Sequence, residues 1–530
     1  MREYDYVIVG AGSAGCVLAN RLSADSRTSV CLLEAGGGDK SPLLHVPAGW
    51  AATFNNKKYD WAYETEPEPE LNNRRIFWPR GKALGGSSSI NGMIYIRGVP
   101  LDFAAWEQAG AKGWSWEDVL PYFVKAERQQ TFDDDLHGSE GPLHVQDVVD
   151  KRPIHDTFLD AMEEQGVPRN ADFNGIDQAG CGYYQFTQKN GRRWSAASAY
   201  LKPARGRSNL DIKTKVQTQR IIFEGKKAIG VETERSGRVE VVKARHVIVS
   251  CGAIGSPQLL ELSGVGDSER LSALGININH HLPDVGEHLQ DHLLSKIVYG
   301  TRPDISFNRE VTGARLVPAA LKWFFLRKGP LTTGSAPVGA FLRTRDGLEA
   351  PDIQVHFASG ATLYNEDGKI RALSEPAMTA VVNQSRPESR GSIHINSADH
   401  RQHPQIKANY LSTELDRRTM VDGMKLLLKV FESKALASSI TSRLAPFPEL
   451  DRLDDEALLN HIREDASTVY HPTSTCSIGK VVDENLRVKG LEGLSVVDAS
   501  VMPYVVSGNT NAATIMLAEK NADYLVANIK

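Results

Sequence analysis

The sequence predicts a mixed α/β fold with a parallel sheet at its centre. Three observations lead to this prediction. A strand–turn–helix–strand pattern fills the first 36 residues, strand-like segments return between 210 and 250 and at 494–498, and 301–465 alternates amphipathic helices with strands such as 353–357. Strands that alternate with helices are typical of parallel sheets.

The first element is a strand at 6–9 that ends in a glycine-rich turn, Gly10-Ala11-Gly12-Ser13-Ala14-Gly15. Gly10 makes the tight turn, Gly12 lets a pyrophosphate approach the backbone, and Gly15 lets the following helix pack closely on the strand. A second strand ends at Glu34, about 20 residues farther on, where a carboxylate can accept hydrogen bonds from a ribose. The pattern predicts a site for NAD or FAD and argues against NADP, whose 2′-phosphate a carboxylate would repel.

Later segments are expected to return to the same sheet. They are an alternating strand at 210–216, a strand pair at 220–223 and 228–233, a buried strand at 246–250, and a strand at 494–498 that ends with an acid. A helix over 512–529 closes the chain.

Two further stretches are rich in glycine and serine. The run 81–92 offers a row of backbone N–H groups and hydroxyls, which is the material of an anion-binding nest. In the run 252–266, the sequence predicts that a strand end turns into a helix that begins near Ser256-Pro257 and stops at Gly264.

Composition narrows the classes of protein. The net charge of −4 leaves no basic footprint for nucleic acid, and the five cysteines lack CxxC spacing, so we expect no zinc site, no other metal site and no disulfide framework. Residues 4–9 already have the pattern of a buried strand, so no signal peptide is expected before them. The longest apolar stretch, 316–326, is too short to span a bilayer, and the prediction is a cytoplasmic protein.

Taken together, the motifs resemble the glucose–methanol–choline (GMC) family of FAD-dependent oxidoreductases. The first βαβ unit, both Gly/Ser runs, His-Leu-Gln-Asp-His at 288–292, Tyr-His-Pro at 470–472 and Ser-Gly-Asn-Thr-Asn at 507–511 all resemble it, in the order of the family. They cover essentially the whole chain, and their pattern is most similar to the bacterial alcohol, choline and sorbose dehydrogenases.

The resemblance implies one FAD in an extended pose. Some relatives tether flavin covalently through a histidine in the second loop, where this chain has Ile90, so we expect non-covalent FAD. The implied contacts are Gly10, Gly12, Ser13, Ala14, Gly15, Glu34, Ala35, Leu84, Gly85, Gly86, Ser87, Asn91, Gly92, Met93, Ile94, Val216, Asp498, Ala499, Asn509, Thr510 and Asn511.

His471 matches the active-site base of the family, and Asn509 matches its second catalytic residue. A neutral histidine can take the hydroxyl proton of an alcohol, and an asparagine amide can stabilise the charge that develops on the oxygen. The hydride of the same carbon would pass to flavin N5. We interpret Asp291 and His292 as structural residues, not as a catalytic dyad.

The resemblance also implies two domains with interleaved segments. A Rossmann-like FAD domain is expected at 1–150, 206–300 and 466–530, and a substrate domain of antiparallel sheet and helices at 151–205 and 301–465.

Choline-oxidising relatives carry a glutamate near a segment that matches 335–343, and this chain has no acid there. We therefore expect oxidation of a neutral primary alcohol to the aldehyde, with O₂ or a quinone as electron acceptor. Alternatives are a choline or sugar dehydrogenase, a hydroxynitrile lyase that keeps FAD for structure, and a flavin-binding protein without catalysis.

For two segments of the sequence, two structural interpretations remain open. The polar loop 129–138 can cover the active site as a lid or can be a solvated turn. The basic, aromatic stretch 320–328 can pack on the substrate domain, which is the preferred interpretation, or can rest on a membrane as a peripheral contact.

Overall fold

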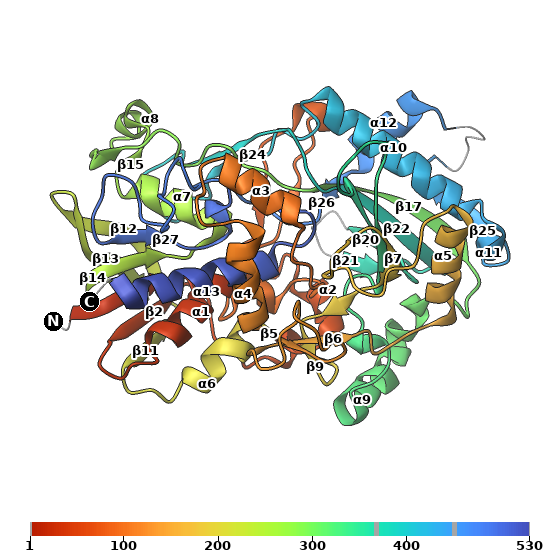
Figure 1. Cartoon of the computed structure of the whole chain (residues 1–530), viewed down its shortest axis with the longest axis horizontal. Helices are drawn as coiled ribbons and strands as arrows, with labels where there is room; N and C mark the ends of the chain where they lie inside the picture. Colours follow the sequence, from red (N-terminus) through yellow and green to blue (C-terminus); the bar gives the residue numbers. More distant parts are fainter. Residues whose placement is uncertain (1–2, 365–369, 448–452, 529–530) are drawn as a thin grey trace.

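A computed structural model of the chain describes residues 3–364, 370–447 and 453–528. Within these residues the chain forms two large sheets that lie side by side along the long axis of the molecule, with both termini beside the first sheet (Figure 1). The mixed α/β prediction is confirmed.

The first sheet is seven-stranded and largely parallel, in the order β11-β2-β1-β14-β13-β12, with β27 also paired to β14. Its strands are β1 (Glu3–Val9), β2 (Val30–Glu34), β11 (Leu210–Thr214), β12 (Gln217–Glu224), β13 (Lys227–Arg235), β14 (Arg238–Val249) and β27 (Leu494–Val496). β1 pairs in parallel with β2 and β14, and β27 pairs in parallel with β14. The strands expected to return to the first sheet therefore do so.

Helices α1 (Ser13–Leu22), α13 (Asn511–Asn528) and α4 (Trp116–Ala126) form a layer beside this sheet, with α13 packed between the other two (Figure 1). The buried carboxylate of Glu519 on α13 pairs with Arg21 of α1 at 2.7 Å. The first and last helices of the chain are thus joined next to the first strand.

The second sheet is seven-stranded and antiparallel, in the order β25-β17-β22-β19-β18-β7, with β26 paired to β17. Its strands are β7 (Gly180–Tyr183), β17 (Leu293–Thr301), β18 (Val338–Leu342), β19 (Ile353–Ala358), β22 (Ala377–Gln384), β25 (Ile440–Ala445) and β26 (Ser467–Thr468). Helices α5 (Pro153–Glu164), α10 (Glu414–Phe431) and α12 (Asp455–Asp465) lie beside it, and Phe158 of α5 stacks on Phe357 of β19 at 4.1 Å between ring centroids.

Smaller elements complete the fold. The short helices are α2 (Trp50–Thr53), α3 (Pro100–Gln108), α6 (Lys202–Ala204), α8 (Ser268–Ala273) and α11 (Lys434–Ala437). A three-stranded sheet joins β5 (Glu127–Gln129), β6 (Leu143–Asp147) and β8 (Gln185–Phe186).

The strands follow the predicted interleaving closely. Strands of the first sheet come from 1–150, 206–300 and 466–530, but β17 begins before the predicted boundary at 300, and β26 joins the second sheet from the last segment. The division into two domains itself stays a prediction.

One helix begins earlier than predicted. Helix α7 spans Gly252–Leu262 and contains Pro257, whose ring nitrogen leaves the carbonyl of Ala253 without its helical donor. The Thr475 hydroxyl donates to that carbonyl at 2.7 Å. A contact from the far end of the chain thus replaces the missing hydrogen bond, and the helix extends back to Gly252.

Helix α9 (Leu316–Leu326) stands out from the body of the molecule (Figure 1). Ala319 and Trp323 are buried in a small cluster with Leu331, against which Val46, Ala48 and Val311 pack, whereas Val317, Phe324 and Phe325 are exposed. The helix is therefore packed on one face and open on the other, and its packing partners come from both predicted domains. Among the described residues, no helix is both long and apolar enough to cross a membrane.

Candidate active site

One cavity of ≈ 2050 Å³ runs between the two sheets. At one end it is lined by the glycine turn that follows β1, and at the other by His471 and Asn509. The carboxyl ends of β1, β2 and β14 open into it through Val9, Glu34 and Ser250, which is where parallel sheets generally bind ligands.

The N-termini of helices α1 and α13 meet at the glycine end of the cavity. The Ser13 hydroxyl at the start of α1 donates to the Asn511 side chain at the start of α13, at 2.7 Å. Both helices therefore direct their N–H groups and the positive ends of their dipoles toward the same part of the cavity. A Cβ placed on Gly12 would meet only the Ser250 carbonyl, at 3.9 Å, so the space above Gly12 is open.

Gly15 has a different role from Gly12. A Cβ on Gly15 would clash with the Gly10 carbonyl, and Gly15 does not line the cavity. Gly10 itself has φ of +98°, a backbone conformation that glycine adopts without strain. Gly15 therefore serves helix packing, and its assignment as a direct cofactor contact stays a prediction.

Glu34 lines the cavity at the end of β2. Its carboxylate accepts hydrogen bonds from the backbone N–H groups of Ala11, at 2.9 Å, and Gly36, at 2.7 Å. Burial raises the pKa of Glu34 to about 7, although these two hydrogen bonds and Lys82 act in the other direction. A hydroxyl that donates to the carboxylate would act in the same direction as these hydrogen bonds and bring the pKa of Glu34 back down.

The second glycine loop lies against the first. A Cβ on Gly86 would approach the Cα of Gly12 to 2.6 Å, and the guanidinium of buried Arg193 holds the loop through the Ser88 carbonyl, at 3.2 Å, and the Asn91 side chain, at 2.7 Å. Gly86, Ser87, Asn91, Gly92, Met93 and Ile94, which are among the predicted cofactor contacts, line the cavity. Leu84 and Gly85 do not, because they turn behind the loop, where the Gly85 N–H donates to the Ala11 carbonyl at 2.7 Å.

Asp498 cross-links the strand end to α7. Its carboxylate accepts from the Gly252 N–H at 2.8 Å and the Ser256 hydroxyl at 2.6 Å on one oxygen, and from the Ser500 N–H at 2.8 Å on the other. Asp498 and Ala499 line the cavity, and the predicted Val216, Ala35 and Thr510 line it too.

At the other end of the cavity, His471 is buried and contacts two side chains. Its Nδ1 lies 3.0 Å from Nδ1 of His292, and its Nε2 lies 3.2 Å from Nδ2 of Asn509. Burial lowers the pKa of His471 well below its ordinary value, and neighbouring His292 and Arg80 lower it further. The ring is therefore neutral at physiological pH, as a general base must be.

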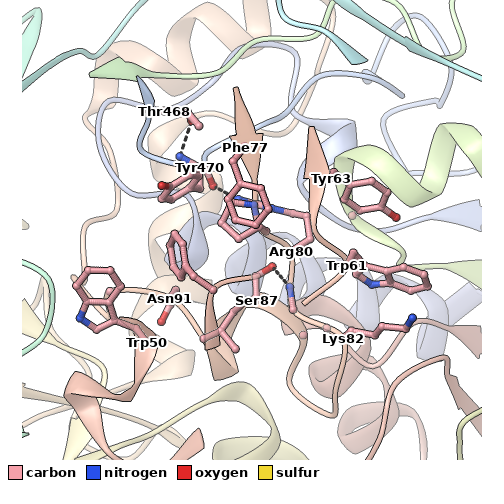
Figure 2. A pocket seen from close by; sticks show the side chains of 18 of the residues that line it. Trp50, Trp61, Tyr63, Phe77, Arg80, Lys82, Ser87, Asn91, Thr468 and Tyr470 are labelled. Carbon is pink, nitrogen blue, oxygen red and sulfur yellow. Dashed lines mark hydrogen bonds between the residues drawn. The ribbon is translucent and has the colours of Figure 1, made fainter. Parts of the chain in front are cut away.

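The backbone before His471 is strained and held from several sides. Tyr470 has φ of +67°, the left-handed region that non-glycine residues rarely adopt. Its N–H donates to the Thr468 hydroxyl at 2.6 Å, and Arg80 donates to its carbonyl at 2.6 Å (Figure 2). Asp291 accepts from the His471 N–H at 2.6 Å and from the hydroxyls of Thr468 and Tyr410. Asp291 thus anchors the turn that presents His471, which agrees with its structural interpretation.

Aromatic side chains line much of the cavity wall. Figure 2 shows Trp50, Phe77 and Tyr470 around one part of it, with Trp61 and Tyr63 along another. The Phe54 ring meets Tyr470 edge-on at 5.4 Å, next to His471. Such a wall favours the apolar body of a ligand.

Comparisons with known proteins agree with this geometry. A family model described as GMC oxidoreductase matches residues 4–294, and a second model with the same description matches 387–518. The chain belongs to the GMC oxidoreductase family. It is 43% identical to an alcohol dehydrogenase [acceptor] of Pseudomonas putida, over 99% of this chain and 96% of that protein. It is 40% identical to an oxygen-dependent choline dehydrogenase of Photobacterium profundum, over 99% and 93%.

Among solved structures, pyridoxine 4-oxidase from Mesorbium loti superposes with a TM-score of 0.89 at 31% identity, over 99% of this chain and 100% of that one. This GMC chain is therefore an FAD-dependent oxidoreductase of the class that acts on CH–OH donors. The cavity fits the cofactor, because paired helix N-termini, an open space above Gly12 and a buried carboxylate at Glu34 are what a pyrophosphate and a ribose require.

Gln354 and His356 of this GMC enzyme were not found by sequence reasoning, and His292 was interpreted as a structural residue only. His292 touches the ring of His471, and Gln354 donates to Asn509 at 3.2 Å. His356, on the same strand as Gln354, lines the cavity, and burial lowers its pKa to about 4. An alternation of polar side chains along 354–356 is the one sequence signal for the two residues on β19.

The loop 129–138 does not line the cavity. Gln129 bonds Gln185 at 2.9 Å, and His137 bonds Glu127 at 3.2 Å and Asp172 at 3.0 Å, which raises the pKa of His137 to about 9. These contacts hold the loop away from the site, so the lid interpretation has no support among the described residues.

Proposed function

We propose that this enzyme oxidises a neutral primary alcohol with an apolar body to the aldehyde, with His471 as the base and Asn509 as the group that holds the substrate oxygen. The observation that carries the proposal is the distance of 3.2 Å between Nε2 of His471 and Nδ2 of Asn509 at the aromatic-walled end of the cavity.

The two side chains would act on different atoms of the substrate hydroxyl group, His471 on its proton and Asn509 on its oxygen. An alcohol oxygen that reaches both atoms donates its proton to Nε2 of His471 and accepts a hydrogen bond from Nδ2 of Asn509. As the proton leaves, Asn509 stabilises the negative charge on the oxygen, and buried His471 becomes cationic. FAD, when bound, supplies the hydride acceptor at flavin N5. We assign the FAD contacts to the predicted residues that line the cavity.

Charge supports a neutral substrate. Segment 335–343 has no acid, and the lining carboxylate nearest His471 along the chain, Asp465, is paired with Lys296 at 3.0 Å. A cationic head group such as that of choline would need a carboxylate free of such a partner. The dehydrogenase of Pseudomonas putida, named for an alcohol, is accordingly a better guide to the substrate than the choline dehydrogenases.

An anaerobic titration tests this proposal. The enzyme is mixed with 1-butanol, 1-octanol, benzyl alcohol, glucose or choline, and the band of oxidised flavin is followed. We expect the uncharged primary alcohols to bleach the band and choline to do so far more slowly. A preference for choline would overturn the neutral-substrate assignment, and cyanohydrin cleavage without bleaching by any alcohol would favour a lyase. Peroxide formed on admission of air would identify O₂ as the electron acceptor. Turnover that requires an added quinone would identify a quinone as the acceptor.

We also propose that the open face of α9 rests on an anionic membrane surface. Val317 is 61% exposed, Phe324 61% and Phe325 71%. The bases Arg315, Lys322, Arg327 and Lys328 flank them, and the sequence has no acid from 311 to 345. Leu316 and Ala320 of the same helix line the cavity, so an apolar molecule in a bilayer would have a short way to it. Exposed apolar side chains with a basic rim are typical of helices that lie on anionic lipids.

Sedimentation with vesicles tests the membrane contact. Wild type should sediment with phosphatidylglycerol-rich vesicles at low salt and less with pure phosphatidylcholine. The double variant Phe324→Ser, Phe325→Ser should stay in the supernatant, whereas Ile176→Ser, which removes another exposed apolar side chain, should sediment like wild type. Equal sedimentation of all three would contradict the proposal, and self-association that the double variant abolishes would assign the face to a second copy instead.

A further inference from the structure

A continuous chain of hydrogen bonds passes through both proposed reacting side chains and ends on a backbone carbonyl at each side. We name it the relay, and its members in order are the Ser385 carbonyl, His292, His471, Asn509, Gln354, Tyr184 and the Val355 carbonyl. The relay joins six separate parts of the chain, at 184, 292, 354–355, 385, 471 and 509.

The Ser385 end determines which nitrogens of the histidines carry protons. A carbonyl only accepts, so Nε2 of His292, 2.9 Å from the Ser385 oxygen, must be protonated. Burial lowers the pKa of His292 to about 4, so the ring is neutral and its Nδ1 is an acceptor. His471 must then donate from Nδ1 across the 3.0 Å contact, which leaves its Nε2 with a lone pair.

The other end determines the orientation of the Asn509 amide. The Tyr184 hydroxyl donates to the Val355 carbonyl at 2.7 Å, so it accepts from Gln354 at 3.3 Å. The same Nε2 of Gln354 donates its second hydrogen to Oδ1 of Asn509 at 3.2 Å. With its oxygen engaged, Asn509 presents its NH₂ group to His471.

The two ends therefore reach the same polarity independently. From one side Nε2 of His471 is an acceptor, and from the other side a donor faces it. If the Asn509 amide were reversed, its Oδ1 would face the lone pair of His471 Nε2, and two acceptors would be in contact. Protonation of His471 on both nitrogens would relieve this contact, but burial of the ring disfavours it. The hydrogen-bond polarity is thus determined by backbone carbonyls that no change of protonation can reverse.

A glycine makes room for the far anchor. A Cβ on Gly339 of β18 would clash with both the Val355 carbonyl and the Tyr184 hydroxyl. A larger residue there would separate the two groups, so the backbone at Gly339 is part of the same arrangement.

We propose that His292, Gln354 and Tyr184 are positioning residues that keep Nε2 of His471 as the proton acceptor and turn the Asn509 NH₂ group toward the substrate oxygen. This inference rests on the proposed function. It adds that the base is prepared before substrate arrives, so that no tautomer change is needed when the hydroxyl proton is transferred.

The first pair of variants changes polarity at Gln354. Gln354→Met removes the donor at similar volume, and we expect kcat/KM to fall roughly tenfold with the same pH profile. Gln354→Glu offers only acceptors, so the Asn509 amide turns and its oxygen faces His471, which then binds a proton more readily. We expect kcat/KM at pH 7 to fall roughly 10²-fold or more and the acid limb to move to higher pH, with recovery in alkali.

The second pair tests the other end without adding charge. His292→Gln keeps an oxygen that can accept from Nδ1 of His471, whereas His292→Leu leaves that donor buried without a partner. We expect His292→Gln to retain activity within roughly tenfold and His292→Leu to lose roughly 10²-fold. Flavin content and melting temperature are measured for all four variants, so that a folding defect is recognised.

The ¹⁵N shifts of the His471 ring provide a readout that does not depend on turnover. With histidine labelled and His471→Asn used for assignment, wild type should show a protonated Nδ1 and an unprotonated Nε2, and Gln354→Glu should show protonation at Nε2. A protonated Nε2 of His471 in wild type would overturn the relay. So would equal losses of kcat/KM and equal pH profiles in Gln354→Met and Gln354→Glu. If no alcohol bleaches the flavin, the proposed function fails, while the ¹⁵N shifts still decide on the relay.

Discussion

The two ends of the cavity are built on different principles. At the glycine end, backbone N–H groups and the close approach of Gly86 to Gly12 form the site, with Gly12 in the turn after β1 and Gly86 in the second glycine loop. At the histidine end, side chains from five separate segments meet in the relay. The first end depends on local backbone shape, and the second depends on tertiary assembly.

This difference implies that the two ends fail in different ways. A change at the histidine end should remove chemistry while the cofactor stays bound. A change at the glycine end should weaken folding or cofactor binding while the base stays in place. The variants below test that separation.

The largest expected effect is that of His471→Ala, because the proposed base is lost. We expect the rate of flavin reduction by a primary alcohol to fall roughly 10²–10⁴-fold, with flavin content unchanged. Stopped-flow mixing without oxygen measures it. Loss of FAD together with activity would mean that the two ends are not independent.

Asn509→Ala should have the next largest effect. Removing one donor to a developing oxyanion costs roughly 10²–10³ in kcat. Because Asn509 also lines the cavity near the start of α13, Asn509→Asp is the matched variant, with nearly the same shape but no NH₂ group. The rate of flavin reduction by the alcohol should fall by a similar factor in both variants. An Asn509→Asp variant that reduces flavin as fast as wild type would contradict the role of the amide.

At the glycine end, Gly15→Ala and Gly12→Ala form a pair with opposite expectations. A Cβ on Gly15 clashes with the Gly10 carbonyl, so we expect the free energy of unfolding to fall by about 1–3 kcal/mol. A Cβ on Gly12 points into open space, so the apoprotein should unfold like wild type while FAD binds roughly tenfold more weakly. Thermal unfolding and fluorescence titration with FAD measure the two effects, and equal destabilisation by both variants would contradict the comparison.

The same difference explains what could be predicted from sequence. The βαβ unit was predictable because the turn at Gly10–Gly15 and the acid at Glu34 lie within one short segment. His471 and Asn509 were found because their motifs resemble a family. The contacts of the relay were not predictable, because His292, Gln354 and Tyr184 come together only when β17, β19 and the segment after β7 are assembled. The early start of α7 was missed for the same reason, since it depends on Thr475.

The smallest expected effect is in the pH profile. The neutral imidazole is the active form of the base, and it is present above the pKa of His471. Because that pKa lies well below the ordinary value, kcat/KM should stay flat as the pH falls from about 8 to about 6.5, where an ordinary histidine would already be half protonated. An acid limb centred at or above that pH would show that His471 is not held neutral.

The central proposal is that this GMC enzyme oxidises uncharged primary alcohols with His471 as the base. The most direct measurement is anaerobic stopped-flow reduction of wild type and His471→Ala by 1-octanol and by choline. The account predicts rapid bleaching of the flavin by the alcohol, slow or no bleaching by choline, and a loss of the rapid phase in the variant at full flavin content. Equal reduction rates in wild type and variant, or faster reduction by choline, would contradict it.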